Sequence, residues 1–167
     1  MKILFVCTAN ITRSVMAEAI FRHLLSQHPH PGTAIHVESA GVDALVGESP
    51  DASTQSVCRE HNTDVARHKA RQVTAEMIEG VDLVLCLAEE HKRLILGAYP
   101  RFKGKVFLLR EYHRDKPGKK LSVDDPTGRS LRQYEKCYSR IEEEVTRIYT
   151  LTAAPTDGTM PSVSAPR

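Results

Sequence analysis

The chain has 167 residues, 41% of them hydrophobic, so it has the length of one domain and enough apolar material for a core. Its 23 Lys and Arg nearly balance its 21 Asp and Glu, and a net charge of +2 gives no reason to expect nucleic acid as a partner. No apolar run is long enough to span a bilayer and no signal peptide opens the chain, so we expect a cytoplasmic protein without membrane insertion.

Strands and helices are predicted to alternate along most of the chain. A continuous apolar run, typical of a strand buried on both faces, occurs at residues 3–7, and further short strands are expected at 35–40, 81–87 and 106–109. Stretches with helical spacing or a helix-start signal follow the first three strands, at 14–25, from Pro50 and Asp51 toward Glu60, and at 89–96. This alternation predicts a three-layer α-β-α domain with a four-stranded parallel sheet.

The last predicted helix begins near Ser130 and frays after Tyr149. Its apolar side chains recur every three or four residues and can pack on the sheet, at Leu131, Tyr134, Tyr138, Ile141, Val145, Ile148 and Tyr149. The residues beyond the helix include three prolines and almost nothing to bury. We therefore expect one domain over residues 1–152 and a disordered tail over 153–167.

The four cysteines, at positions 7, 58, 86 and 137, lie far apart and never at a Cys-x2-Cys spacing. This pattern fits neither a zinc site nor a secreted disulfide framework, so we expect reduced thiols and no bound metal. Cys7 stands out because it ends the first strand. In sheets of this kind, ligands bind at the carboxyl ends of the strands.

The segment from Cys7 to Ser14 places a cysteine at the end of a buried strand and Arg13 at the start of a helix. A loop in this position can turn its backbone N–H groups toward an anion, and an arginine can hold two phosphate oxygens in a fork. The same positive field favours the thiolate form of Cys7. The residues expected to surround the anion are Thr8, Ala9, Asn10, Ile11, Thr12, Arg13 and Ser14.

This segment resembles the signature of the low-molecular-weight protein tyrosine phosphatases, which is Cys-x5-Arg-Ser followed by a Met-Ala-Glu-Ala helix. Here that helix begins at Met16 and reads Met-Ala-Glu-Ala. Further matches follow in the family's order and spacing, at Ser39-Ala40-Gly41, His68-Lys69-Ala70-Arg71 and Asp125-Pro126. The resemblance covers most of residues 1–150.

The resemblance implies hydrolysis of phosphate monoesters through a phosphocysteine, with neither a metal nor another cofactor. Cys7 would attack phosphorus, Arg13 and the loop amides would stabilise the phosphoryl oxygens, and Asp125 would be the general acid. Asp124 remains the alternative acid; Asp125 is preferred because a proline follows it and stiffens the loop. The substrate would be a phosphorylated protein or peptide, and inorganic phosphate would be the product or an inhibitor.

The resemblance also assigns supporting roles. Ser14 would donate a hydrogen bond to the sulfur, and Asn10 would hold a left-handed turn of the loop, which asparagine tolerates. Ser39 and His68 would form hydrogen bonds with that asparagine. For His68 the alternative is a surface histidine within a basic cluster.

The sequence departs from the family's usual residues at Ala9, Thr12, Val15, Ala44 and Thr127, and none of these changes removes a catalytic group. Thr12 stands where relatives have a second cysteine that can trap an oxidised nucleophile, so Cys7 is expected to oxidise past sulfenic acid more easily. Ala44 and Thr127 replace aromatic residues that flank the phosphate pocket in many relatives. They predict a less apolar wall for the substrate ring.

Three other functions are compatible with parts of the pattern. In the resembling arginine phosphatases a threonine follows the loop asparagine, so Ile11 favours phosphotyrosine over phosphoarginine. Thioredoxin-coupled arsenate reductases need further cysteines, and none follows Cys86 in residues 87–101. A phosphoprotein-binding module without turnover would require neither Cys7 nor Asp125.

The basic residues are concentrated in one part of the chain. Between Arg101 and Arg132, ten Lys or Arg accompany four Asp or Glu, and this segment leads into the expected acid. One interpretation is a solvated, flexible loop. The other is a positively charged wall that attracts phosphorylated, acidic peptides.

Overall fold

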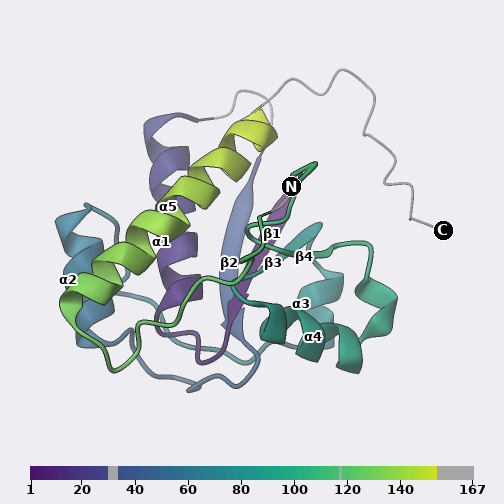
Figure 1. The fold of residues 1–167 in the computed structure, drawn as a ribbon, viewed down its shortest axis with the longest axis horizontal. Coiled ribbons are helices and arrows are strands. Elements are labelled where there is room, and N and C mark those ends of the chain that lie inside the picture. Colours follow the sequence, from purple (N-terminus) through teal and green to yellow (C-terminus); the bar gives the residue numbers. More distant parts are fainter. Residues whose placement is uncertain (30–33, 117, 154–167) are drawn as a thin grey trace.

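The computed structural model describes residues 1–29, 34–116 and 118–153. One parallel sheet has the strand order β2-β1-β3-β4, with bounds β1 Lys2–Cys7, β2 His36–Gly41, β3 Leu83–Cys86 and β4 Val106–Leu108. One face is covered by α1 (Arg13–Gln27), α2 (Ala52–Glu60) and α5 (Leu131–Ala153) (Figure 1). The other is covered by α3 (Ala75–Glu79), α4 (Glu89–Ala98) and the 3-10 turn η1 (Pro100–Phe102). The predicted three-layer fold is confirmed.

The central position of β1 explains its continuous apolar run. Alternate side chains of a strand point to opposite faces of the sheet. Ile3, Phe5 and Cys7 pack toward α1 and α5, whereas Leu4 and Val6 pack toward α3 and α4, and all five are buried. Because β1 pairs with β2 on one side and β3 on the other, its carboxyl end lies where the strand order reverses, the usual ligand position of open parallel sheets.

Most elements lie within a few residues of their predicted positions, with two corrections in the last helix. The prediction that it frays after Tyr149 is wrong, because α5 continues to Ala153. Leu131 is 44% exposed and does not join the core, because it occupies the first position of the helix. The other members of the predicted stripe are buried. The rest of the predicted tail, residues 154–167, lies outside the described residues.

Two short elements, α3 and η1, were not predicted. A helix of five residues is too short to show apolar periodicity, and the signal for α3 is its cap: the Thr74 hydroxyl accepts a hydrogen bond from the amide of Met77. Within the described part of the chain, no helix combines the length and apolar character needed to cross a membrane.

A buried carboxylate on α5 attaches residues 101–132, called the basic segment below, to the core. Glu144 is 2% exposed and lies 3.0 Å from Arg114, 3.0 Å from Arg147 and 3.6 Å from Arg110. Arg147 also donates to two carbonyl groups of the segment that follows β4. Part of the basic excess is therefore structural, which neither interpretation of the sequence anticipated.

Replacing this carboxylate should destabilise the fold. Glu144→Gln leaves three arginines without their shared anion, and we expect the free energy of unfolding in urea to fall by about 2 kcal/mol, because the arginines are partly exposed. Glu143→Gln is the matched control: its exposed pair with Arg140 should be worth less than about 0.5 kcal/mol. Equal effects of the two substitutions would contradict the proposed anchor.

Candidate active site

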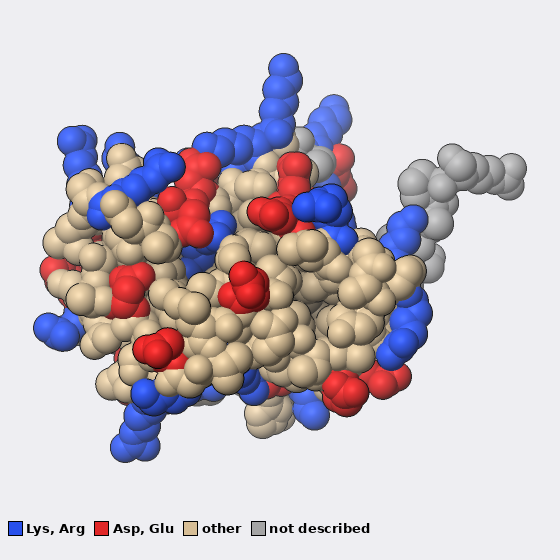
Figure 2. All heavy atoms as spheres, turned by 90° about the horizontal axis from the view of Figure 1, so that it is seen from below, with Lys and Arg blue, Asp and Glu red and all other residues tan. Residues whose placement is uncertain are grey.

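Residues 7–14, from the last residue of β1 to the second residue of α1, are called the anion loop below. The strands run downward in Figure 1, so this loop lies at the lower end of the molecule, which Figure 2 shows face-on with Lys and Arg projecting around its rim. The carbonyl groups of Cys7, Thr8 and Ala9 accept hydrogen bonds from amides of the segment 42–45. The amides of residues 8–12 have no acceptor within the described residues. The arrangement leaves several N–H groups for an anion.

A close approach explains the glycine that ends β2. A Cβ at Gly41 would lie 2.3 Å from the carbonyl oxygen of Thr8, so no larger residue fits beside the anion loop. The backbone of Gly41 also exchanges hydrogen bonds with Arg71 and Val73. The end of β2 therefore connects the anion loop to the segment that carries His68.

The side chain of Asn10 has a fixed orientation. This residue is fully buried in the left-handed conformation, with φ 57°. Its Oδ1 accepts from the backbone amide of Arg71 at 3.0 Å, and an amide N–H can only donate. Its Nδ2 therefore donates to the Oγ atoms of Ser14 and Ser39, each at 2.9 Å.

These contacts orient two serine hydroxyl groups. Ser39 accepts from Asn10 and donates to Oε2 of Glu18 at 2.6 Å. Ser14 also accepts from Asn10, and its Oγ lies 2.9 Å from Sγ of Cys7. Toward a thiolate, which can only accept, the Ser14 hydroxyl is the donor.

His68 also contacts Asn10, through the backbone. Its Nε2 lies 2.9 Å from the carbonyl oxygen of Asn10, and because a carbonyl only accepts, Nε2 is the donor. The structure thus brings both predicted partners to Asn10, Ser39 at the side-chain amide and His68 at the main chain.

Arg13 joins the anion loop to the segment 123–127, called the acid loop below. The arginine is 5% exposed; Nη1 donates to the carbonyl of Val123 at 3.1 Å, and Nη2 donates to Oγ1 of Thr8 at 3.3 Å and Oδ2 of Asp125 at 2.5 Å. Thr127 donates to the other oxygen of Asp125 from its hydroxyl at 2.7 Å and its amide at 3.0 Å. Burial raises the pKa of Asp125, but these Thr127 hydrogen bonds and the charge of Arg13 outweigh burial and hold the pKa below its ordinary value.

The neighbouring aspartate has a different partner. Asp124 forms an exposed ion pair with Lys120 at 2.6 Å, and the hydrogen bond from Lys120 lowers the pKa of this carboxyl. It has no contact with Arg13 within the described residues. The geometry therefore favours Asp125 over Asp124 as the group that faces the anion loop.

Thr12 connects the anion loop to two helices. Its hydroxyl donates to Oδ2 of Asp51 at 2.8 Å, and the Tyr134 hydroxyl on α5 donates to the same oxygen at 3.1 Å. The other oxygen of Asp51 caps α2 by accepting from the amide of Thr54 at 2.8 Å. The residue that replaces the family's second cysteine is therefore part of a polar junction.

The remaining cysteines lie in the core. Burial raises the pKa of Cys58 to about 11 and that of Cys137 to about 12, and it raises the pKa of Cys86 further. All four cysteines are free thiols. Among the described residues, no group of three or more His, Cys, Asp or Glu side chains is placed to hold a metal ion.

Sequence reasoning missed His91. This residue lies in the first turn of α4 with 1% exposure, and its Nε2 is 3.0 Å from Oγ1 of Thr8. Its signal was its position: a histidine three residues into a helix that directly follows β3, at the edge of the sheet where ligands bind.

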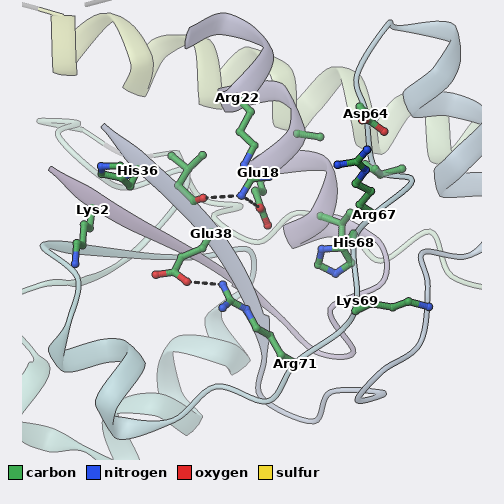
Figure 3. A pocket seen from close by; sticks show the side chains of 14 residues that line it. Lys2, Glu18, Arg22, His36, Glu38, Asp64, Arg67, His68, Lys69 and Arg71 are labelled. Atoms are coloured by element: carbon green, nitrogen blue, oxygen red, sulfur yellow. Dashed lines mark hydrogen bonds and ion pairs between the residues drawn. The ribbon is translucent and has the colours of Figure 1, made fainter. Parts of the chain in front are cut away.

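Two cavities are lined by residues outside the anion loop. One, of about 370 Å³, adjoins the acid loop, and its basic lining residues come from the segments that flank this loop and from α5: Arg110, Lys120, Arg129, Lys136 and Arg140. The larger, of about 790 Å³, lies at the outer edge of β2 and carries charges of both signs (Figure 3). Two of its arginines are already paired, Arg22 with Glu18 at 2.7 Å and Arg71 with Glu38 at 2.5 Å.

Residues 2–154 match the family described as low molecular weight phosphotyrosine protein phosphatase. The protein-arginine-phosphatase of Bacillus subtilis (strain 168) is 35% identical over 144 residues, covering 86% of this chain and 91% of that protein. The probable low molecular weight protein-tyrosine-phosphatase EpsP of Ralstonia solanacearum is 34% identical over 143 residues, covering 86% and 90%. A solved structure of a mutant of the arginine phosphatase YwlE, with a phosphorylated active site serine, has a TM-score of 0.84 and 31% identity, covering 93% and 97%.

The fold and these matches define the class, a phosphatase of α/β fold with a cysteine at the end of its first strand. Within that class, the chain belongs to the low molecular weight phosphotyrosine protein phosphatase family.

The junction at Thr12 should contribute to stability. Thr12→Val removes a donor to the half-buried carboxylate of Asp51, and we expect the free energy of unfolding to fall by about 1 kcal/mol in urea denaturation. Thr54→Val is the matched control, because the Thr54 hydroxyl is buried without a hydrogen-bond partner in the described residues and its loss should be neutral or stabilising. A Thr12→Val protein as stable as the control would show that the Asp51 contact contributes nothing.

Proposed function

We propose that this chain hydrolyses phosphotyrosine in phosphorylated proteins or peptides through a phosphocysteine on Cys7. One observation carries the proposal: Arg13 contacts Asp125 and stands on the same loop as Cys7, whose sulfur lies 2.9 Å from the Ser14 hydroxyl. A nucleophile, a cation and a proton donor thus surround a loop with free amides. The proposal includes neither a metal nor another cofactor.

In the first step, Arg13 and the loop amides bind the phosphoryl oxygens. Sγ of Cys7, as the thiolate, attacks phosphorus, a P–S bond forms, and the bond from phosphorus to the phenolic oxygen breaks. Asp125 gives its proton to that oxygen. For this role the carboxyl must be protonated, and the incoming phosphate favours protonation because it takes Arg13 from Asp125 and adds negative charge nearby.

In the second step, Asp125 takes a proton from water as the water oxygen attacks phosphorus. The P–S bond breaks, Cys7 is regenerated, and inorganic phosphate leaves. The hydrogen bond from Ser14 favours sulfur as the leaving group, because it stabilises negative charge there. The phosphorylated active site serine in the related arginine phosphatase mutant supports such a covalent route.

The acid-loop cavity supports a phosphorylated, anionic substrate. Arg129 and Lys136 line it and form no ion pair within the described residues, whereas Lys120 is neutralised by Asp124. Free cations beside Asp125 raise the local concentration of acidic peptides. A nucleophile that must stay reduced also fits the cytoplasm.

A second candidate is hydrolysis of phosphoarginine, favoured by the Bacillus subtilis relative that is named for this activity. Position 11 separates the two candidates. Ile11 is apolar and supports contact with a tyrosine ring. Comparing kcat/KM for phosphotyrosine and phosphoarginine peptides decides between them, and higher values for phosphoarginine would replace the first proposal with the second.

Hydrolysis of p-nitrophenyl phosphate tests the assigned roles. We expect Cys7→Ser to abolish turnover and Asp125→Asn to lower kcat by about a hundredfold, as expected on loss of a general acid. Asp124→Asn is the matched control and should change kcat less than about twofold, because an acid that takes no part in proton transfer supplies none of that catalysis. A wild-type protein that binds phosphopeptides without turnover would establish a binding module instead.

Thr127 should set the pH range of the acid. Thr127→Val removes a hydrogen bond that lowers the pKa of Asp125, so this pKa should rise and more of the carboxyl should be protonated at a given pH. The alkaline limb of the kcat/KM profile should therefore move to higher pH. Thr127→Ser, which keeps the hydroxyl, should leave the limb in place. If the alkaline limb of the Thr127→Val profile stays in place, Asp125 is not the group whose titration produces that limb.

A further inference from the structure

The proposed route leaves one buried titratable side chain at the site without a role. His91 comes from α4, the helix that follows β3 (Figure 1). Its ring contacts Thr8 of the anion loop. The side chain is nearly inaccessible, with 1% exposure. A buried imidazole must have its polar atoms paired, and both nitrogens of His91 have partners.

The partners fix which nitrogen carries the proton. Nδ1 lies 3.1 Å from the backbone nitrogen of Ala88, and this amide can only donate, so Nδ1 is the acceptor. Burial and the charge of Arg13 lower the pKa of His91 to about 4, so the ring is neutral near pH 7. The single proton is therefore on Nε2, which donates to Oγ1 of Thr8 at 3.0 Å.

The Thr8 hydroxyl then has its acceptor sites filled. Its oxygen receives one N–H from His91 and a second from Nη2 of Arg13 at 3.3 Å. A hydroxyl has two acceptor lone pairs and one proton. Neither nitrogen can accept that proton, and no other acceptor contacts it within the described residues. The hydroxyl proton is thus directed toward space beside the guanidinium.

That space adjoins the position of the ligand. The same Nη2 atom of Arg13 donates to Thr8 and to Asp125, so the hydroxyl and the carboxylate lie on either side of one guanidinium nitrogen. In the proposed function a phosphoryl oxygen replaces the carboxylate at Arg13. Such an oxygen comes within reach of the Thr8 proton and accepts it as a charge-assisted hydrogen bond.

We propose that Thr8 is a side-chain donor to the phosphoryl group and that His91 is its positioning residue, acting through the Thr8 hydroxyl. The inference rests on the proposed function only in that the anion loop binds a phosphoryl group. His91 transfers no proton itself. Its role is to occupy an acceptor site of Thr8, so that the hydroxyl keeps donating into the anion site.

Binding of inorganic phosphate, measured by calorimetry, tests the donor directly. Thr8→Val should weaken phosphate binding about tenfold, the usual loss for one hydrogen bond to a charged group, and Thr8→Ser should recover most of it. Thr54→Val, remote from the loop, is the control for a threonine-to-valine change and should bind phosphate as the wild type does. Unchanged binding in Thr8→Val would overturn the proposal.

Two substitutions of His91 separate positioning from support of the fold. His91→Asn keeps an acceptor for the amide of Ala88 but has no donor that reaches Thr8, whereas His91→Gln offers a donor at the position of Nε2. We expect His91→Asn to weaken phosphate binding as Thr8→Val does, and His91→Gln to recover most of the loss. Adding His91→Asn to Thr8→Val should cost no further affinity. Additive losses, or equal losses in both His91 variants, would assign His91 a structural role.

Calorimetry also separates this inference from the proposed function. If the wild type binds phosphate but hydrolyses no phosphomonoester, the function fails while the Thr8 and His91 comparisons can still be made. If the wild type hydrolyses p-nitrophenyl phosphate and Thr8→Val binds phosphate normally, the function stands and this inference fails.

Discussion

The site depends on one buried residue in a left-handed conformation. Asn10 turns the anion loop, and the backbone amide of Arg71 fixes which end of its side chain donates. Its amide group also contacts two serines: Ser39, which donates to Glu18, and Ser14, whose hydroxyl lies 2.9 Å from the sulfur of Cys7. Because these partners come from β2, α1 and the segment before α3, the folded scaffold shapes the loop before any ligand binds, which is the condition for electrostatic preorganisation.

The ion pair beside the anion loop allows Arg13 to change its partner when a ligand binds. Arg13 is buried and paired with a half-exposed Asp125, and a phosphoryl group competes for the same guanidinium. The Lys and Arg residues of the basic segment have two roles, and amino-acid composition alone does not show which residue has which role. Arg110 and Arg114 attach it to Glu144 in the core, while Arg129 belongs to a cavity beside the acid loop. A net charge of +2 therefore says little about the field at the site.

The sequence was sufficient for the fold class and for the anion loop, because both are local signals. Buried parallel strands are continuous apolar runs, and a cysteine and an arginine on one strand-loop-helix unit must lie close together. The contacts of His91 with Thr8, of Thr12 with Asp51 and of Glu144 with Arg110 and Arg114 join segments remote in sequence. They depend on how layers pack, and no spacing along the chain encodes that packing.

The central claim is that the sulfur of Cys7 carries the phosphoryl group during turnover. The most direct measurement is mass spectrometry of the protein quenched in acid while it hydrolyses p-nitrophenyl phosphate. The account predicts one phosphoryl group, on the peptide that contains Cys7. Steady hydrolysis with an unmodified Cys7 peptide, or with the phosphoryl group on another residue, would contradict it.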